Sequence, residues 1–129
     1  MAAIVKTTFQ LNGSFKFIAV VQITGDAAGD ISQVDAVQVS ALTAGIGGVP
    51  TEFKIDSVDW EFTGFTGSLN WHGDVDTLAL ALPQYDGSIQ FTQPLNNDAG
   101  AGKDGDLHLT TNGLGAGMTG TIIIKGRHK

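Results

Sequence analysis

Apolar and polar residues alternate over short runs along most of this chain, and glycine-containing breaks separate the runs. Side chains two positions apart lie on the same face of an extended strand, so this alternation indicates strands with one buried face. The clearest run places five apolar residues on one face: Phe15, Phe17, Ala19, Val21 and Ile23. No stretch repeats its apolar residues at the helical period, so the pattern predicts an all-β protein with little or no helix.

Three dipeptides between these runs, Asn12-Gly13, Asp86-Gly87 and Asn112-Gly113, suit the positive φ angles of hairpin turns. They predict three hairpins, in which strands 3–10 and 14–24, 77–82 and 88–92, and 106–111 and 118–127 are neighbours.

The run 52–62 contains a phase slip, because Phe53 and Ile55 fall on one parity and Val58, Trp60 and Phe62 on the other. A β-bulge near Asp56-Ser57 would bring all five side chains to one side of the strand. The alternation also predicts a weaker strand at 31–42 and a strand at 68–72 with Leu69 and Trp71 on one face. The consecutive residues Ile122, Ile123 and Ile124 predict a strand buried on both faces.

These runs amount to about eight or nine strands. A single sheet of that size would expose one apolar face and two edges, whereas two layers hide the apolar face. The sequence therefore predicts one domain over 1–129, an antiparallel β-sandwich or jelly roll.

The composition of the chain excludes several kinds of site and partner. The chain has no cysteine, which excludes disulfides, thiolate metal sites and cysteine nucleophiles. Eleven Asp and two Glu give a net charge of −6, and an acidic surface disfavours nucleic acid as a partner. The N-terminus lacks the pattern of a signal peptide, and no apolar run reaches membrane-spanning length. We expect a protein that folds in a cytoplasm and does not bind a membrane.

Two glycine-rich segments resemble nucleotide-binding loops only superficially. In 100–104 the residue after Lys103 is Asp104, where a phosphate loop requires Ser or Thr. The segment 113–117 leads into a predicted strand, whereas a dinucleotide fingerprint leads into a helix. No serine lies in a Gly-x-Ser-x-Gly elbow, and no histidine is linked by sequence to a nucleophile. We therefore expect no enzymatic activity, no catalytic residues and no cofactor.

Two clusters could hold a metal ion. His72, Asp74 and Asp76 alternate, so in an extended segment they would project from one face. Gly73 and the neighbouring Asp residues favour a turn between strands over a metal site. The polar loop at 96–106 contains Asp98, Asp104 and Asp106, whose spacing does not match an EF-hand. Asx turns are the favoured interpretation there, and calcium binding stays open.

Two features of the sequence, its basic C-terminal end and its strand threonines, favour contacts with other proteins over metal binding. The basic end at 125–129 is either a solvated tail or a contact with an acidic neighbouring subunit. Threonine is frequent in the predicted strands and suits faces that meet water or another subunit. Its positions are Thr7, Thr8, Thr110, Thr111, Thr119 and Thr121.

Segments of the second half of the chain resemble small β-rich virion proteins of tailed bacteriophages, especially capsid decoration (cement) proteins. The resemblance lies in 55–60, 67–71, 74–80 and 97–111. It implies a protein of the phage head that binds the major capsid protein, reinforces the shell and forms a homo-oligomer, with a trimer favoured. End strands are commonly sheet edges, so we expect 2–8 and 125–129 to take part in assembly, and deletion of 126–129 to weaken incorporation without unfolding the protein.

Two other functions stay open from the sequence. One is a carbohydrate-binding module that uses Trp60, Trp71 or Tyr85 with calcium-ordered Asp residues. For the aromatic set Trp60, Phe62, Phe65, Trp71 and Tyr85, however, a place in the core is the favoured interpretation. The other is a different virion part, such as a tail-tube or head–tail connector subunit.

Overall fold

The computed structural model describes residues 4–13, 16–25, 34–38, 42, 53–73, 76–82, 85–95 and 105–128. Within these ranges the chain forms nine strands and no helix, which confirms the predicted all-β class. No helix of the described residues has the length and apolarity needed to cross a membrane. The strands are β1 (Ile4–Asn12), β2 (Lys16–Thr24), β3 (Val34–Val37), β4 (Phe53–Phe62), β5 (Thr66–Trp71), β6 (Thr77–Leu82), β7 (Asp86–Leu95), β8 (Leu107–Asn112) and β9 (Thr119–His128).

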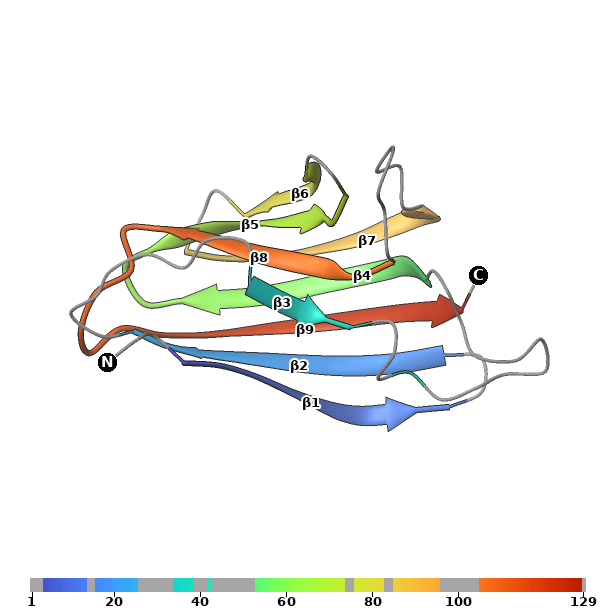
Figure 1. Cartoon of the computed structure of the whole chain (residues 1–129), viewed down its shortest axis with the longest axis horizontal. Helices are drawn as coiled ribbons and strands as arrows, with labels where there is room; N and C mark the ends of the chain where they lie inside the picture. Colours follow the sequence, from blue (N-terminus) through green and yellow to red (C-terminus); the bar gives the residue numbers. More distant parts are fainter. Residues whose placement is uncertain are drawn as a thin grey trace.

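The strands form two antiparallel sheets (Figure 1). The five-stranded sheet has the order β1-β2-β9-β4-β7, and the four-stranded sheet has the order β3-β8-β5-β6. Strand β2 pairs with β9, β3 with β8, β4 with β7 and β5 with β6, as in one long hairpin folded over itself. This pairing is that of a jelly roll, with β1 added beside β2 as an edge strand.

The core lies between the inner faces of the two sheets. In β2 the predicted alternation holds, since Phe17, Ala19, Val21 and Ile23 are each at most 1% exposed. Leu69 and Trp71 of β5 face them from the other sheet and are fully buried, as predicted. The two layers also meet through a hydrogen bond from the Thr7 hydroxyl to the Ala36 carbonyl.

The predicted bulge in the fourth strand is confirmed. The register of β4 shifts between Ile55 and Ser57 against both of its neighbours, β7 and β9. Beyond the bulge, Val58 and Phe62 are buried like Phe53 and Ile55 before it. The extra residue lets one strand keep all of these side chains in the core despite the parity change.

Two of the three predicted hairpins are wrong. Asp86 and Gly87 lie inside β7, opposite Glu61 and Trp60 of β4, and β6 and β7 belong to different sheets. Strands β8 and β9 also belong to different sheets, although Gly113 has the positive φ of 88° that its dipeptide suggested. In a jelly roll most connections cross between layers, so a glycine turn there joins strands that do not pair.

The predicted hairpin of β1 and β2 is confirmed by the pairing of these strands. Its turn, however, is not centred on Asn12-Gly13 as predicted. Strand β1 pairs with β2, but Asn12 is still part of β1 and lies opposite Phe17. The chain reverses beyond it, where the Gly13 amide donates to the Lys16 carbonyl at 3.0 Å. The weaker strand predicted at 31–42 is confined to Val34–Val37 in the described residues.

The C-terminal strand is not a sheet edge. Strand β9 lies between β2 and β4, so its residues bond to neighbours on both sides, and only β1 of the two end strands is an edge. Lys125 and Arg127 are thus strand residues instead of parts of a solvated tail. Removal of 126–129 would delete paired residues of a central strand, which contradicts the expectation of an intact fold.

Two further sequence expectations hold only in part. Ile122 and Ile124 are buried, but Ile123 on the opposite face is only half-buried. Among the threonines, Thr8 and Thr119 are exposed, whereas Thr111 is buried and Thr7 faces the other sheet through its hydrogen bond.

Gly126 fills a position in β9 where no side chain fits. A Cβ atom there would lie 2.5 Å from the Lys54 carbonyl oxygen and 2.6 Å from the Phe17 ring. We expect Gly126→Ala to lower the free energy of unfolding by about 1–3 kcal/mol, because backbone and a packed ring must shift. Urea denaturation measures the change. Gly115→Ala, whose Cβ would meet nothing within 4 Å, is the matched control, and equal stability of both variants would contradict this packing.

Candidate functional site

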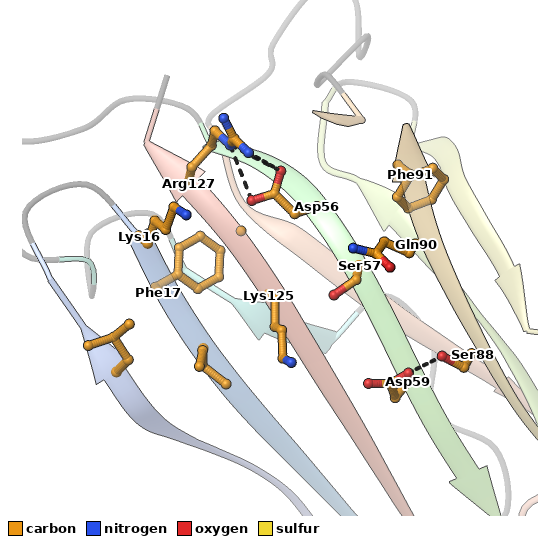
Figure 2. Close-up of a pocket in the computed structure, with 13 residues that line it drawn as sticks. Lys16, Phe17, Asp56, Ser57, Asp59, Ser88, Gln90, Phe91, Lys125 and Arg127 are labelled. Carbon is orange, nitrogen blue, oxygen red and sulfur yellow. Dashed lines mark hydrogen bonds and ion pairs between the residues drawn. The ribbon is translucent and has the colours of Figure 1, made fainter. Parts of the chain in front are cut away.

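A shallow hollow of about 500 Å³ lies on the outer face of the five-stranded sheet (Figure 2). It spans all five strands at the level of the two β-bulges, one in β1 between Phe9 and Leu11 and one in β4 between Ile55 and Ser57. A bulge bends its strand and increases the local twist, so two bulges at one level hollow this end of the sheet.

Charged and polar side chains surround the hollow. Arg127 binds both carboxylate oxygens of Asp56 through its Nε, at 3.0 and 3.1 Å, and its Nη2 lies 2.9 Å from Oδ1. At the other end the Ser88 hydroxyl donates to Asp59, and Figure 2 shows both pairs. Among its described lining residues no histidine accompanies the serines Ser57 and Ser88.

An apolar patch adjoins these charges and consists of Leu11, Ile18, Val20 and Ile123. Leu11 lies directly opposite Ile18, and Val20 lies directly opposite Ile123, so the four side chains are neighbours on β1, β2 and β9. Leu11 is 46% exposed and the other three are half-buried. None of the described strands covers this face, so a contiguous apolar surface faces outward there.

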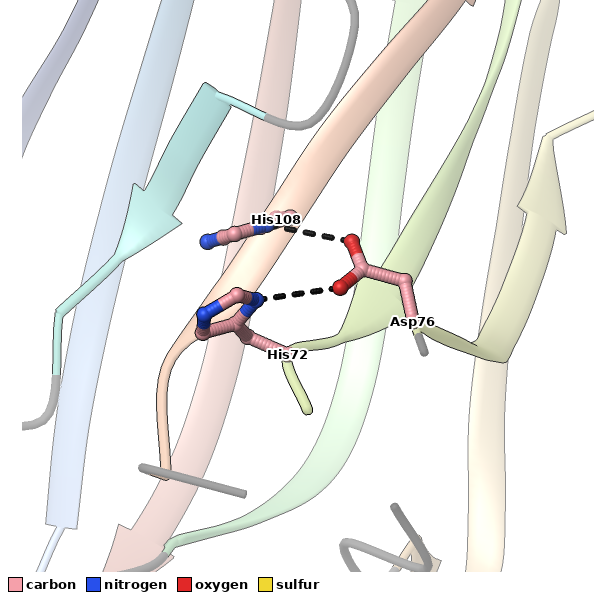
Figure 3. A group of neighbouring side chains, drawn as sticks. All are labelled: His72, Asp76 and His108. Atoms are coloured by element: carbon pink, nitrogen blue, oxygen red, sulfur yellow. Dashed lines mark hydrogen bonds and ion pairs between the residues drawn. The ribbon is translucent and has the colours of Figure 1, made fainter. Parts of the chain in front are cut away.

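A second cluster lies on the outer face of the four-stranded sheet and consists of His72, Asp76 and His108 (Figure 3). His72 follows β5, Asp76 precedes β6, and His108 belongs to β8, which is the neighbour of β5. Leu107 and Leu109 point into the core, so the alternation of β8 directs His108 outward between them.

The Asp76 carboxylate joins the two histidines. Its Oδ1 lies 3.0 Å from His72 Nδ1, and its Oδ2 lies 3.1 Å from His108 Nδ1. The two imidazole rings are stacked with centroids 4.1 Å apart. His108 Nε2 lies 3.0 Å from an oxygen of Asp35 on β3, so the contacts reach all four strands of this sheet or their ends.

The Asp76 side chain is only 9% exposed, and its contacts favour the ionised carboxylate. Burial by itself raises the pKa of its carboxyl group. The hydrogen bonds from His72 and His108, the positive charge of His108 and a backbone hydrogen bond from Gly73 act in the opposite direction. Together they outweigh burial, and the pKa of Asp76 lies below its usual value.

The sequence located part of this cluster. His72 and Asp76 are brought together, in the connection between β5 and β6 where a turn was expected, and Asp74 lies outside the described residues. His108 was missed because its strand is far away in the sequence. The available signal was the alternation of β8, which directs one polar residue outward between two core leucines. Of the acidic residues in the loop at 96–106, Asp98 and Asp104 lie outside the described residues and only Asp106 lies within them, so the structure does not test calcium binding by this loop.

The aromatic residues do not form one platform. Trp71, Phe62 and Phe65 are buried, and Trp60 packs against the core, as the favoured interpretation expected. Tyr85 is 59% exposed, so the expectation of a core position was wrong for this residue. Trp71 in particular cannot stack on an external sugar ring.

Comparison of the chain with models of protein families, with curated proteins and with solved structures gave no match.

The Arg127–Asp56 pair is half-exposed, with side chains 36% and 25% accessible. We expect Asp56→Asn to lower the free energy of unfolding by about 0.5–1 kcal/mol at low salt and by less in 1 M NaCl, since solvent and salt screen such pairs. Chemical denaturation at both salt concentrations measures this. Asp59→Asn, which alters a hydrogen bond with Ser88 instead of an ion pair, is the control. A salt-independent loss above about 2 kcal/mol would show that the pair acts as a buried one.

Proposed function

We propose that this protein is a virion structural protein, a decoration protein that binds the outer face of a phage head and reinforces it. The observation that carries the proposal is the outer face of the five-stranded sheet, which none of the described strands covers and where the apolar patch lies next to charges of both signs. Contiguous apolar surface rimmed by polar residues is typical of protein-binding sites.

The charge pattern favours a protein partner. Lys16 and Lys125 lie on the same face as Asp59, so this surface offers both signs around an apolar centre. Apolar centres with charged rims are the usual composition of specific protein interfaces. The hollow itself is open and shallow, which suits a protruding loop of a neighbouring protein.

The fold and the resemblance support the same conclusion. Jelly rolls are common in viral capsid proteins and lectins, although a fold alone does not define a function. The segments 55–60, 67–71, 74–80 and 97–111 resemble phage decoration proteins. Strand β1 is a free edge among the described strands, so strand addition offers a second contact to a capsid subunit or to another copy of this chain.

In this function the protein binds the major capsid protein at symmetry-related positions, as a homotrimer. Contacts that are weak singly become stable when each trimer bridges several capsid subunits, because the second and third contacts form at high effective concentration. No catalytic step is involved.

The test is addition of the purified protein to capsids that lack it, with occupancy counted by electron microscopy and the mass of the free protein measured by light scattering. We expect a fixed ratio of copies to capsid subunits and a trimeric mass. Wild-type protein that leaves capsids bare would refute the proposal, and binding to tails alone would assign the protein to another virion part.

Variants of the apolar patch sharpen this test. Leu11→Asp and Ile18→Asp place a charge in the patch, and we expect occupancy to fall at least tenfold, because a desolvated unpaired charge opposes docking. Leu78→Asp is the matched control, since Leu78 is 58% exposed on β6 of the other sheet. Far-UV circular dichroism confirms folding. Full occupancy with both patch variants would exclude this face as the docking surface.

A further inference from the structure

The cluster of His72, Asp76 and His108 plays no part in the proposed docking face and requires its own explanation. Each residue offers one ligand atom, and the three atoms lie within 4.8 Å of one another. The Asp76 and His108 side chains are only 9% and 10% exposed, whereas the His72 side chain is 36% exposed. A mostly buried carboxylate with two imidazoles around it is an unusual group of side chains in a small β-sandwich that otherwise buries apolar residues.

The atoms that face one another in this cluster are all able to donate an electron pair to a cation. An ionised carboxylate only accepts hydrogen bonds, and a neutral imidazole has one nitrogen that also only accepts. Asp35 lies 3.0 Å from His108 Nε2, so a proton on that nitrogen has a carboxylate acceptor. His108 Nδ1 faces Asp76 Oδ2 at 3.1 Å, and this contact is bridged either by a proton on Nδ1 or by a metal ion in its place.

We propose that His72, Asp76 and His108 form a binding site for one divalent transition-metal ion of the zinc type. Two imidazole nitrogens and one carboxylate oxygen are a ligand set that zinc and its neighbours in the first transition row prefer. Ligand atoms around tetrahedral zinc lie roughly 3.3 Å apart, given bond lengths of about 2.0–2.1 Å. His72 Nδ1 lies 3.0 Å from Asp76 Oδ1 and His108 Nδ1 lies 3.1 Å from Asp76 Oδ2, and one ligand atom from each residue lies within 4.8 Å of the others, so small side-chain movements bring them to this spacing.

Asp35 supplies the outer contact that such sites have. A metal-binding histidine usually donates its other N–H to a carboxylate, which fixes the tautomer and the ring orientation. His108 has this contact on the nitrogen opposite to the one that faces Asp76. Asp35 is thus a positioning residue, and His108 is held between it and the site.

Binding of a metal ion at this site requires one imidazole ring to change its orientation. The two rings are nearly parallel, with 27° between their planes, whereas a shared ion must lie close to the plane of each ring. The His72 ring is the more exposed of the two and follows the end of β5, so it is the ring that tilts. The bound ion would connect the end of β5, the start of β6 and β8, with a water molecule at the fourth position.

The direct test is titration of the full-length, metal-free protein with ZnCl₂ by isothermal titration calorimetry, with CoCl₂ as a spectroscopic probe. We expect one ion per chain, a rise in melting temperature with zinc concentration, and visible cobalt absorption of a low-coordinate nitrogen–oxygen site. MgCl₂ and CaCl₂ should give no response, because those ions prefer oxygen ligands only. NMR of the imidazoles should show two histidines shifting together with zinc.

Four variants locate the site. His72→Ala alters the most exposed ligand and so carries the least risk of unfolding; we expect it and Asp76→Asn to abolish the cobalt absorption. Asp35→Asn should weaken zinc binding roughly 10- to 100-fold without removing it. Asp59→Asn, on the other sheet, is the matched control and should bind as the wild type does.

Two results would overturn the proposal. One is wild-type protein that binds neither zinc nor cobalt, which would leave the cluster as a proton-bridged structural contact. The other is unchanged binding by folded His72→Ala and Asp76→Asn variants, which would place the ion elsewhere on the chain. Neither result bears on capsid binding, because the docking test uses the opposite sheet.

Discussion

A chain of edge-to-face aromatic contacts joins the two sheets, and the rest of the structure depends on it. Phe9, Phe17 and Phe53 follow one another across β1, β2 and β4, and Phe53 then meets Trp71 of β5 in the other sheet. Neighbouring ring centroids are 5.2–6.3 Å apart, and the rings are steeply inclined, which is the favoured geometry of aromatic pairs. Gly126 of β9 makes room for the Phe17 ring, so the central strand is adapted to this contact.

Because the inner faces are occupied by the core, the outer faces are available for function, and the two differ. The five-stranded sheet presents the apolar patch and a ring of charges, which suit a protein partner. The four-stranded sheet presents a compact group of two histidines and a carboxylate, which suits a metal ion. A metal ion there would stabilise the ends of three strands without touching the proposed docking face. The two proposals are therefore independent physically as well as experimentally.

Local sequence patterns correctly predicted which face of β2 is buried and where β4 has a bulge. They did not predict correctly which strands pair. The parity change between Ile55 and Val58 correctly located a bulge, and the alternation in β2 correctly identified its buried face. The pairing of β8 with β9 was predicted from Asn112-Gly113 and is wrong, because the same glycine conformation also serves a crossing between layers. The sequence identified only part of the His72, Asp76 and His108 cluster for a similar reason, since His108 reaches His72 only through the pairing of β8 with β5.

The sequence by itself determined the β class, the inward sides of β2, β4 and β5, and the bulge in β4. These properties depend on residues two positions apart, and a strand fixes that geometry locally. Only the tertiary structure decided that β9 is central, that Gly87 faces Trp60, and that two histidines from separate strands meet at one carboxylate. Those features depend on which strands become neighbours, and that choice is made by the packing of both sheets at once.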